Sequence, residues 1–77
     1  MKTITVYTSP SCGQCMMTHK ELGKRGIEYV TVGLSEDWAA GPMLREKYGY
    51  TQAPVVVVDD GRHWTGFRPD KIAGLVG

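Results

Sequence analysis

The sequence has few cysteines: Cys12 and Cys15 are the only two in 77 residues, and they stand three positions apart. It also has no run of basic residues longer than Lys24-Arg25, and its formal net charge is +1. Proteins that bind nucleic acid or a membrane surface usually carry a basic patch, so neither partner is expected. No repeat, low-complexity tract or linker divides the chain, and its length predicts one domain, residues 1–77.

Long apolar runs are also absent. The segment MKTITVYT, residues 1–8, alternates apolar and polar side chains, whereas signal peptides and membrane spans need a continuous apolar stretch. We therefore expect a cytoplasmic protein without a membrane span. In a reducing cytosol a close cysteine pair more often serves redox or metal chemistry than a permanent crosslink. A crosslink is disfavoured further because a bridge between residues three apart closes almost no loop.

The first part of the chain reads as strand, helix and strand. Residues 3–7 and 27–32 alternate apolar and polar side chains, which is typical of half-buried strands. Between them, residues 13–25 are mostly good helix formers, followed by Gly26 in the usual position for a helix end. This order predicts a right-handed βαβ unit with parallel strands.

The middle of the chain predicts a second helical segment that begins after Ser35, a plausible N-cap, and ends at Gly49. The pair Gly41-Pro42 interrupts it, because a proline inside a helix is strongly unfavourable. We therefore expect two short helices, the second with Pro42 in its first turn.

The remaining segments complete an α/β fold. Residues 54–58, PVVVV, have no polar face and predict a central strand covered on both sides. A turn at 59–61 and an antiparallel return over 62–67 follow, and then a short helix over 69–76. The inward positions of this helix are Ile72 and either Leu75 or Val76. The predicted order is β-α-β-α-β-β-α, a four-stranded mixed sheet flanked by three helices.

The cysteine pair is expected at the start of the helix over 13–25. There the helix dipole and free backbone N–H groups favour a thiolate, which is the attacking species in thiol–disulfide exchange. Cys12, the outer residue, is predicted to be the exposed nucleophile. Cys15, one turn further in, is predicted to be buried and to act as the resolving thiol, displacing a partner from a mixed disulfide.

Metal binding is the competing interpretation of this pair. A structural zinc site needs four protein ligands, and the available set is Cys12, Cys15, His19 and His63. Small copper-chaperone domains resemble the chain in size and carry a CxxC before a helix, which suits Cu(I). They follow a β-α-β-β-α-β order, however, and have Met where this chain has Pro10. We expect no bound metal, but a soft-metal carrier remains an alternative.

With TQAPVV at residues 51–56, the CxxC resembles the active site of the thioredoxin fold, whose second element is a cis-proline. More narrowly, the chain resembles glutaredoxin-like proteins of the NrdH-redoxin family. The resemblance lies in ITVYTSPSCGQC, GIEYVTV, GYTQAPVVVV and HWTGFRPDKI. The last is the most specific, since the family usually shows W-S-G-F-R-P-D and only Thr65 differs. Gly13 departs from the bulkier apolar residue that is usual there.

The resemblance implies a thioredoxin fold, a redox-active Cys12–Cys15 disulfide and no bound cofactor. It implies a monomer that takes electrons, ultimately from NADPH, through thioredoxin reductase and passes them to the large subunit of a class Ib ribonucleotide reductase. It also implies that an extended substrate segment pairs with the chain at Thr51, Gln52, Ala53 and Pro54.

Comparison with typical glutaredoxins also gives an expectation about glutathione binding. Typical glutaredoxins bind a glutathione carboxylate through backbone N–H groups near the start of the last helix. Here Phe67 is bulky and Pro69 lacks an N–H, which predicts poor glutathione binding. We expect Trp64, Phe67 and Arg68 to contribute to a partner surface instead. A glutathione-dependent glutaredoxin remains the alternative that the choice of reductant distinguishes.

Overall fold

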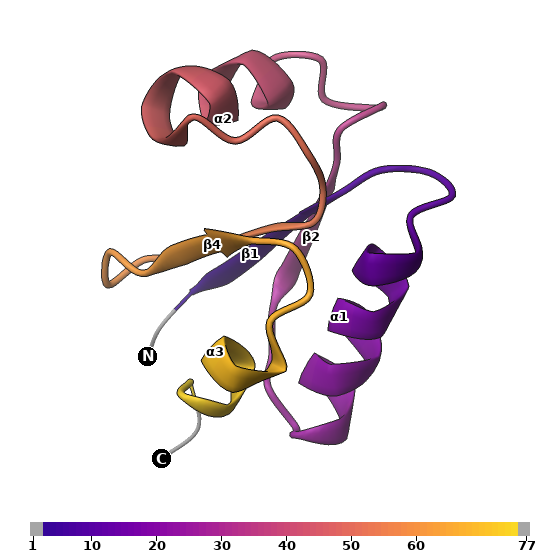
Figure 1. Ribbon diagram of the computed structural model, residues 1–77, viewed down its shortest axis with the longest axis vertical. Helices are drawn as coiled ribbons and strands as arrows, with labels where there is room; N and C mark the ends of the chain where they lie inside the picture. Colours follow the sequence, from indigo (N-terminus) through magenta and orange to yellow (C-terminus); the bar gives the residue numbers. More distant parts are fainter. Residues whose placement is uncertain (1–2, 76–77) are drawn as a thin grey trace.

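The computed structural model describes residues 3–75, which form a four-stranded sheet and three helices (Figure 1). In chain order the elements are β1 (Ile4–Thr8), α1 (Gly13–Lys24), β2 (Val30–Gly33), α2 (Ala40–Tyr48), β3 (Val55–Val58), β4 (His63–Thr65) and α3 (Pro69–Ala73). Within this part of the chain, no helix has the length and apolar character needed to cross a membrane. The predicted order of elements is confirmed.

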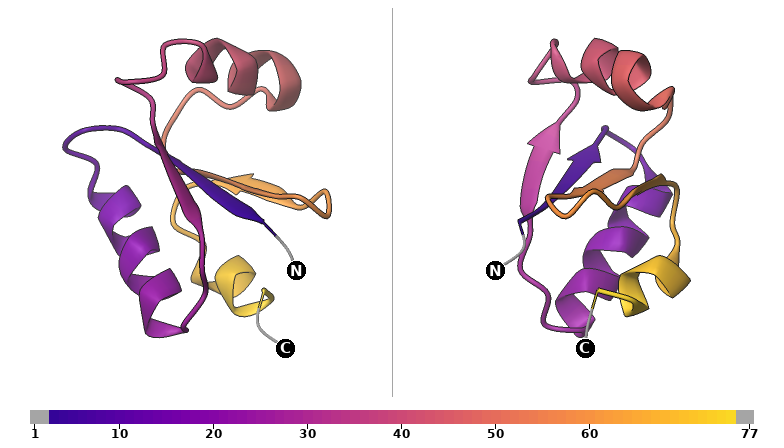
Figure 2. Two further views of the ribbon diagram at one scale, coloured as in Figure 1. Left: turned by 180° about the vertical axis from the view of Figure 1, so that it is seen from behind. Right: turned by 90° about the vertical axis from the view of Figure 1, so that its left-hand side faces the viewer.

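The sheet is mixed, with strand order β2-β1-β3-β4. β1 runs parallel to β2 and antiparallel to β3, and β4 runs antiparallel to β3. Helices α1 and α3 cover one face, and α2 lies over the other (Figures 1 and 2). Thr8 is opposite Gly33 and Tyr7 is opposite Val55. The ends of β1 and β2 and the start of β3 therefore meet at one edge, where the loop to the cysteines begins.

The core lies mainly between the sheet and the pair α1 and α3. Its buried members are Ile4, Val6, Leu22, Val56, Val58, Trp64 and Ile72. On the opposite face, Leu44 of α2 and Val55 of β3 are buried. Because successive strand residues point to opposite faces, the apolar run of β3 supplies both layers. This confirms its prediction as a covered central strand.

The second strand begins later than predicted, at Val30 rather than residue 27. The reason is the end of α1: Gly26 has φ +69°, and the Ile27 N–H donates to the Leu22 carbonyl at 2.9 Å. This helix-terminating arrangement holds Ile27 against the core and leaves it outside the sheet ladder. Strand pairing starts only where Val30 comes opposite Thr5.

The first of the two predicted short helices in the middle segment is wrong. Residues 34–39 form turns, because the N–H groups of Glu36 and Asp37 both donate to the Gly33 carbonyl and Asp37 Oδ1 accepts from the Ala39 N–H at 3.2 Å. Ser35 is accordingly not an N-cap. The second helix is confirmed as α2, with Pro42 in its first turn and Gly49 at its end with φ +78°.

The last two elements are shorter than predicted. β4 ends at Thr65 because Gly66, with φ +85°, turns the chain and its N–H donates to the Pro54 carbonyl at 2.9 Å. α3 ends at Ala73. Ile72 is buried as expected and Leu75 packs partly against the core, whereas Val76 lies outside the described residues.

Candidate active site

The two cysteines lie at the N-terminus of α1 and form a disulfide, with their Cα atoms 5.2 Å apart. Cys12 is the N-cap of the helix in an extended conformation, and its Sγ accepts a hydrogen bond from the Cys15 N–H at 3.1 Å. Ser11, just before it, has φ +56° and directs the chain from the loop into the helix. The predicted position and pairing of the cysteines are confirmed.

The two sulfur atoms differ in their surroundings. Cys12 is half-buried, whereas the Cys15 side chain is only 3% exposed. The first turn of α1 contains no acidic side chain, so the positive end of the helix dipole is not neutralised there. That field and the Cys15 N–H both favour a negative charge on Cys12 Sγ in the reduced state. The geometry suits nucleophilic attack by Cys12, with Cys15 held one turn below.

The segment before β3 contains the predicted substrate-facing residues. The Ala53–Pro54 peptide bond is cis, and Pro54 is buried. Thr51 and Gln52 are exposed. Within residues 3–75, the backbone N–H groups of 51–53 donate no hydrogen bond to the protein. This short stretch of backbone, which bends at Gln52 and Ala53, is therefore open to pairing with another chain.

A set of hydrogen bonds joins this segment to the turn after β4. The Thr65 hydroxyl lies 2.9 Å from the Gln52 carbonyl oxygen and 3.1 Å from that of Pro54. The Gly66 N–H donates to the Pro54 carbonyl. Thr65, which replaces the serine usual in the resembled family, keeps a hydroxyl at the position that fixes these two backbones together.

Gln14 connects the same turn to the cysteines, and sequence reasoning did not single it out. Its Oε1 accepts a hydrogen bond from the Phe67 N–H at 3.1 Å, between residues 53 positions apart. The same oxygen would be the nearest neighbour of a Cβ added at Gly66. The available signal was the position of Gln14 between Cys12 and Cys15, which does not by itself indicate a contact.

The three predicted partner-surface residues lie in different surroundings. Trp64 is 4% exposed and belongs to the core, so its side chain serves packing. Phe67 is half-buried against that core. Arg68 is exposed and pairs with Asp70 at 3.0 Å, a hydrogen bond that lowers the pKa of the Asp70 carboxyl below its ordinary value. Phe67 and Arg68 thus present accessible atoms beside the site.

The histidines of the hypothetical zinc set are engaged elsewhere. His19 Nδ1 lies 3.0 Å from the Tyr29 hydroxyl, and His63 Nδ1 lies 2.8 Å from the Tyr50 hydroxyl. Across residues 3–75, no three His, Cys, Asp or Glu side chains gather in a group that could hold a metal ion. The observed order of elements also differs from that of the copper-chaperone domains.

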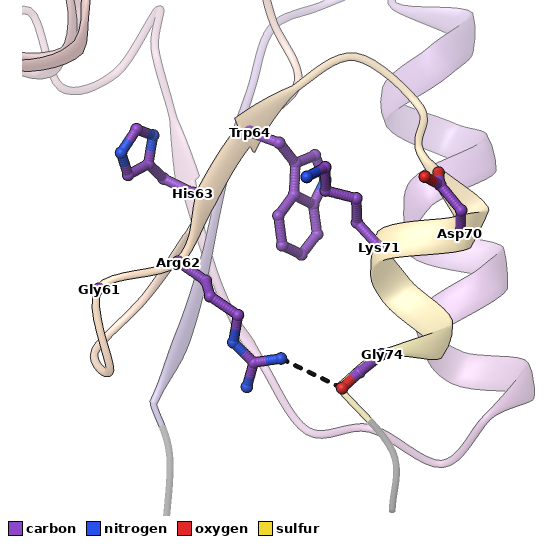
Figure 3. A pocket seen from close by; sticks show the side chains of 7 residues that line it. All are labelled: Gly61, Arg62, His63, Trp64, Asp70, Lys71 and Gly74. Carbon is purple, nitrogen blue, oxygen red and sulfur yellow. Dashed lines mark hydrogen bonds between the residues drawn. The ribbon is translucent and has the colours of Figure 1, made fainter.

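Two of the surface hollows on the described part of the chain are lined by predicted site residues. One, of about 480 Å³, lies between β4 and α3 and is lined by Gly61, Arg62, His63, Trp64, Asp70, Lys71 and Gly74 (Figure 3). The Arg62 guanidinium crosses it to donate to the Gly74 carbonyl at 3.1 Å, so this hollow is tied to α3 and contains neither cysteine. The other, of about 320 Å³, includes Thr51 and Gln52 and therefore adjoins the site.

Known proteins share this sequence and arrangement. The glutaredoxin family model matches residues 4–64. The glutaredoxin-like protein NrdH of Escherichia coli K12 is 38% identical over 72 residues, covering 94% of this chain and 86% of that protein. The corresponding protein of Salmonella typhimurium LT2 is 40% identical over 73 residues, covering 95% and 88%. The structure of the E. coli NrdH-redoxin superposes with a TM-score of 0.91 at 36% identity, covering 97% of this chain and 96% of that one.

These matches span the strands, the cysteine helix and the segment before β3. The match in structure extends to nearly the full length of both chains. They agree with a disulfide at a helix N-terminus in a four-stranded mixed sheet, which is the thioredoxin fold predicted from the sequence. The chain belongs to the glutaredoxin family as a glutaredoxin-like redoxin of the NrdH type, a thiol–disulfide oxidoreductase with the thioredoxin fold.

Proposed function

We propose that this redoxin, a cytoplasmic monomer of one domain over residues 1–77, carries electrons from thioredoxin reductase to the large subunit of a class Ib ribonucleotide reductase. The observation that carries the proposal is the asymmetric cysteine pair. A half-buried Cys12 at the N-terminus of α1 forms a disulfide with a buried Cys15. At the same edge of the sheet, the backbone N–H groups at 51–53 have no partner in the described chain. Such a pair suits a protein disulfide that enters as an extended segment.

The reaction is an exchange of disulfides. The Cys12 thiolate attacks one sulfur of the partner's disulfide, the partner's other sulfur leaves as a thiolate and takes a proton from solvent, and a mixed disulfide remains. Cys15, as a thiolate, then attacks Cys12 Sγ, and the partner's second sulfur leaves and is protonated. The partner gains two electrons, and the Cys12–Cys15 disulfide is formed. NADPH, through the flavoprotein reductase, resets the pair, so the redoxin needs no bound cofactor.

The substrate is proposed to lie along Thr51, Gln52 and Ala53, with buried Pro54 closing one side. Backbone pairing gives affinity with little dependence on sequence. Phe67 and Arg68, on the turn held by Gln14, are proposed to contact the partner next to the disulfide, since aromatic and arginine side chains commonly anchor interfaces. In this proposal Trp64 contributes by supporting Phe67 from the core.

Two features support thioredoxin reductase over glutathione as the reductant. The Phe67 N–H, which is close to the start of α3, is already bonded to Gln14, and Pro69 has no N–H to offer. A glutathione carboxylate would therefore find few donors here. The related E. coli NrdH-redoxin is described as having a thioredoxin-like activity profile.

The test is NADPH consumption during reduction of the oxidised redoxin, with thioredoxin reductase in one arm and glutathione plus glutathione reductase in the other. Rapid turnover with thioredoxin reductase alone supports the proposal. Turnover only with glutathione would make the protein a glutathione-dependent glutaredoxin. Turnover with neither would favour the soft-metal carrier, to be followed by Cu(I) and Zn(II) titration. Adding the class Ib large subunit then tests the acceptor through deoxyribonucleotide formation.

Replacing Gln14 tests the glutathione argument directly. Gln14→Met keeps a long side chain but frees the Phe67 N–H, which can then donate to a carboxylate. We expect reduction by glutathione to become about threefold faster relative to reduction by 2-mercaptoethanol, which has no carboxylate. Gln14→Glu, which keeps an acceptor oxygen, should show no such gain. If the ratio of the two rates does not change in Gln14→Met, the hydrogen bond does not limit glutathione binding.

A further inference from the structure

The hollow next to residues 51 and 52 is built from four parts of the chain. Its lining residues are Leu34, Gly41, Leu44, Arg45, Tyr50, Thr51, Gln52 and Val55. Leu44 and Val55, at 2% and 1% exposure, form an apolar floor. Gly41, Leu44 and Arg45 are spaced at i, i+3 and i+4 and so share one face of α2. Gly41 carries no side chain, which leaves space over the floor.

The position of the hollow follows from the sheet register. Val55 is opposite Tyr7, and the Leu34 N–H donates to the Thr8 carbonyl at 2.7 Å. The floor therefore lies at the edge of the sheet where β1 ends and the loop to Cys12 begins. In Figure 1 this loop, the segment before β3 and α2 lie toward the same end of the molecule. A chain paired with residues 51–53 would pass along the rim of the hollow.

Arg45 is the one charged residue among those that line the hollow, and it lies at the rim. Arg25, Arg62 and Arg68 pair with Glu21, Asp60 and Asp70 respectively. Arg45 is exposed, and its guanidinium has no ionic or hydrogen-bonded partner among the residues that the structure describes. The hollow is also lined by Thr51 and Gln52, whose side chains are polar but uncharged, and by Tyr50, whose hydroxyl is hydrogen-bonded to His63. The hollow thus combines an apolar floor with one free cation.

We propose that this hollow is a specificity subsite for a glutamate side chain in the partner segment that carries the disulfide. The two methylene groups of the glutamate would cover Leu44 and Leu34, and its carboxylate would meet the Arg45 guanidinium, which suits carboxylates because of its planar pair of donors. The inference rests on the proposed function, because a substrate strand along 51–53 would place alternate side chains on the side of the hollow. It adds a preference for acidic protein segments that backbone pairing alone does not supply.

The test uses short peptides with a central cysteine held as a mixed disulfide with thionitrobenzoate. Each position from two before to two after the cysteine is occupied in turn by Glu, Gln or Lys. Attack by reduced redoxin on the peptide sulfur releases thionitrobenzoate, whose absorbance gives the rate, and no reductase is involved. At low salt we expect one position at which Glu reacts about fivefold faster than Gln, the ratio that a favourable exposed ion pair supports. Added salt should lower the ratio.

Charge reversal provides the sharpest variant. Arg45→Glu should reverse the order at that position, so that Lys reacts faster than Glu, whereas Arg45→Lys should keep most of the wild-type preference. Lys24→Glu, at the far end of α1, makes the same change in net charge and serves as the matched control that should keep the preference.

Equal rates for Glu and Gln at every position in the wild-type protein would overturn the subsite. So would equal effects of Arg45→Glu and Lys24→Glu, because the preference would then come from net charge. In both cases exchange itself would stand. Failure to react with any peptide would instead overturn the proposed exchange with protein disulfides, and the subsite with it.

Discussion

The Cys12→Ser variant is expected to lose disulfide reduction entirely, leaving only the rate of the reaction without protein. A serine hydroxyl is not ionised at neutral pH, and the N-terminus of α1 cannot compensate for the loss of a thiolate nucleophile. In the structure Cys12 is the more accessible of the two cysteines, and its Sγ accepts a hydrogen bond from the Cys15 N–H. The one other cysteine in the sequence, Cys15, is only 3% exposed and is therefore poorly placed to replace it.

The measurement is reduction of a disulfide substrate with NADPH and the matching reductase, at equal protein concentration. The fold of the variant should be compared with that of the reduced wild-type protein by circular dichroism, because both lack the disulfide. Ser11→Gly is the neighbouring control, since glycine readily adopts the positive φ found at residue 11. Activity of Cys12→Ser near the wild-type level would contradict the assignment of the nucleophile.

The second large effect is expected for Cys15→Ser, which should stop the reaction at the mixed disulfide. Cys12 can still attack, but no thiol remains one turn below to release the partner. Because the Cys15 side chain is 3% exposed, an external thiol from a bulky partner should not easily take its place. We expect close to one partner molecule to be trapped per redoxin, while the steady-state turnover rate falls to a small fraction of the wild-type rate.

Trapping can be followed by non-reducing electrophoresis and mass spectrometry with a peptide disulfide as the partner. The Cys12→Ser, Cys15→Ser double variant is the control, and it should trap nothing. Rapid turnover by Cys15→Ser without an accumulating adduct would indicate that the second cysteine is dispensable, as in a monothiol mechanism, and would remove its resolving role.

The parts of the fold that could be predicted are those with a local signal. The apolar run of β3 and the helix over Gly13–Lys24, with glycine beyond its end, carry their periodicity and punctuation within a few residues. The prediction was wrong for the region after β2, because a possible helix start at Ser35 competes there with a turn closed by Asp37. Asp37 uses its carboxylate to close a turn on the Ala39 N–H, and Ser35 does not begin a helix.

The site could be predicted less completely than the fold. The sequence alone shows the spacing of Cys12 and Cys15 and the proline at position 54. The sequence does not show the hydrogen bond from the Phe67 N–H to Gln14, because it joins residues 53 positions apart that meet only in the folded chain. The burial of Trp64 illustrates the same limit, since an aromatic residue in a specific motif suits a core and a binding surface equally well until its neighbours are known.

The contrast between the two tryptophans has a practical consequence for spectroscopy. Trp38 is 84% exposed, whereas Trp64 is 4% exposed and directly precedes the turn that joins the cysteine helix to Pro54. A water-soluble quencher such as iodide reaches the first indole and not the second. The emission that survives quenching therefore comes from Trp64 in the core, so the protein contains its own optical probe of the packing between the sheet and α3 without any added label.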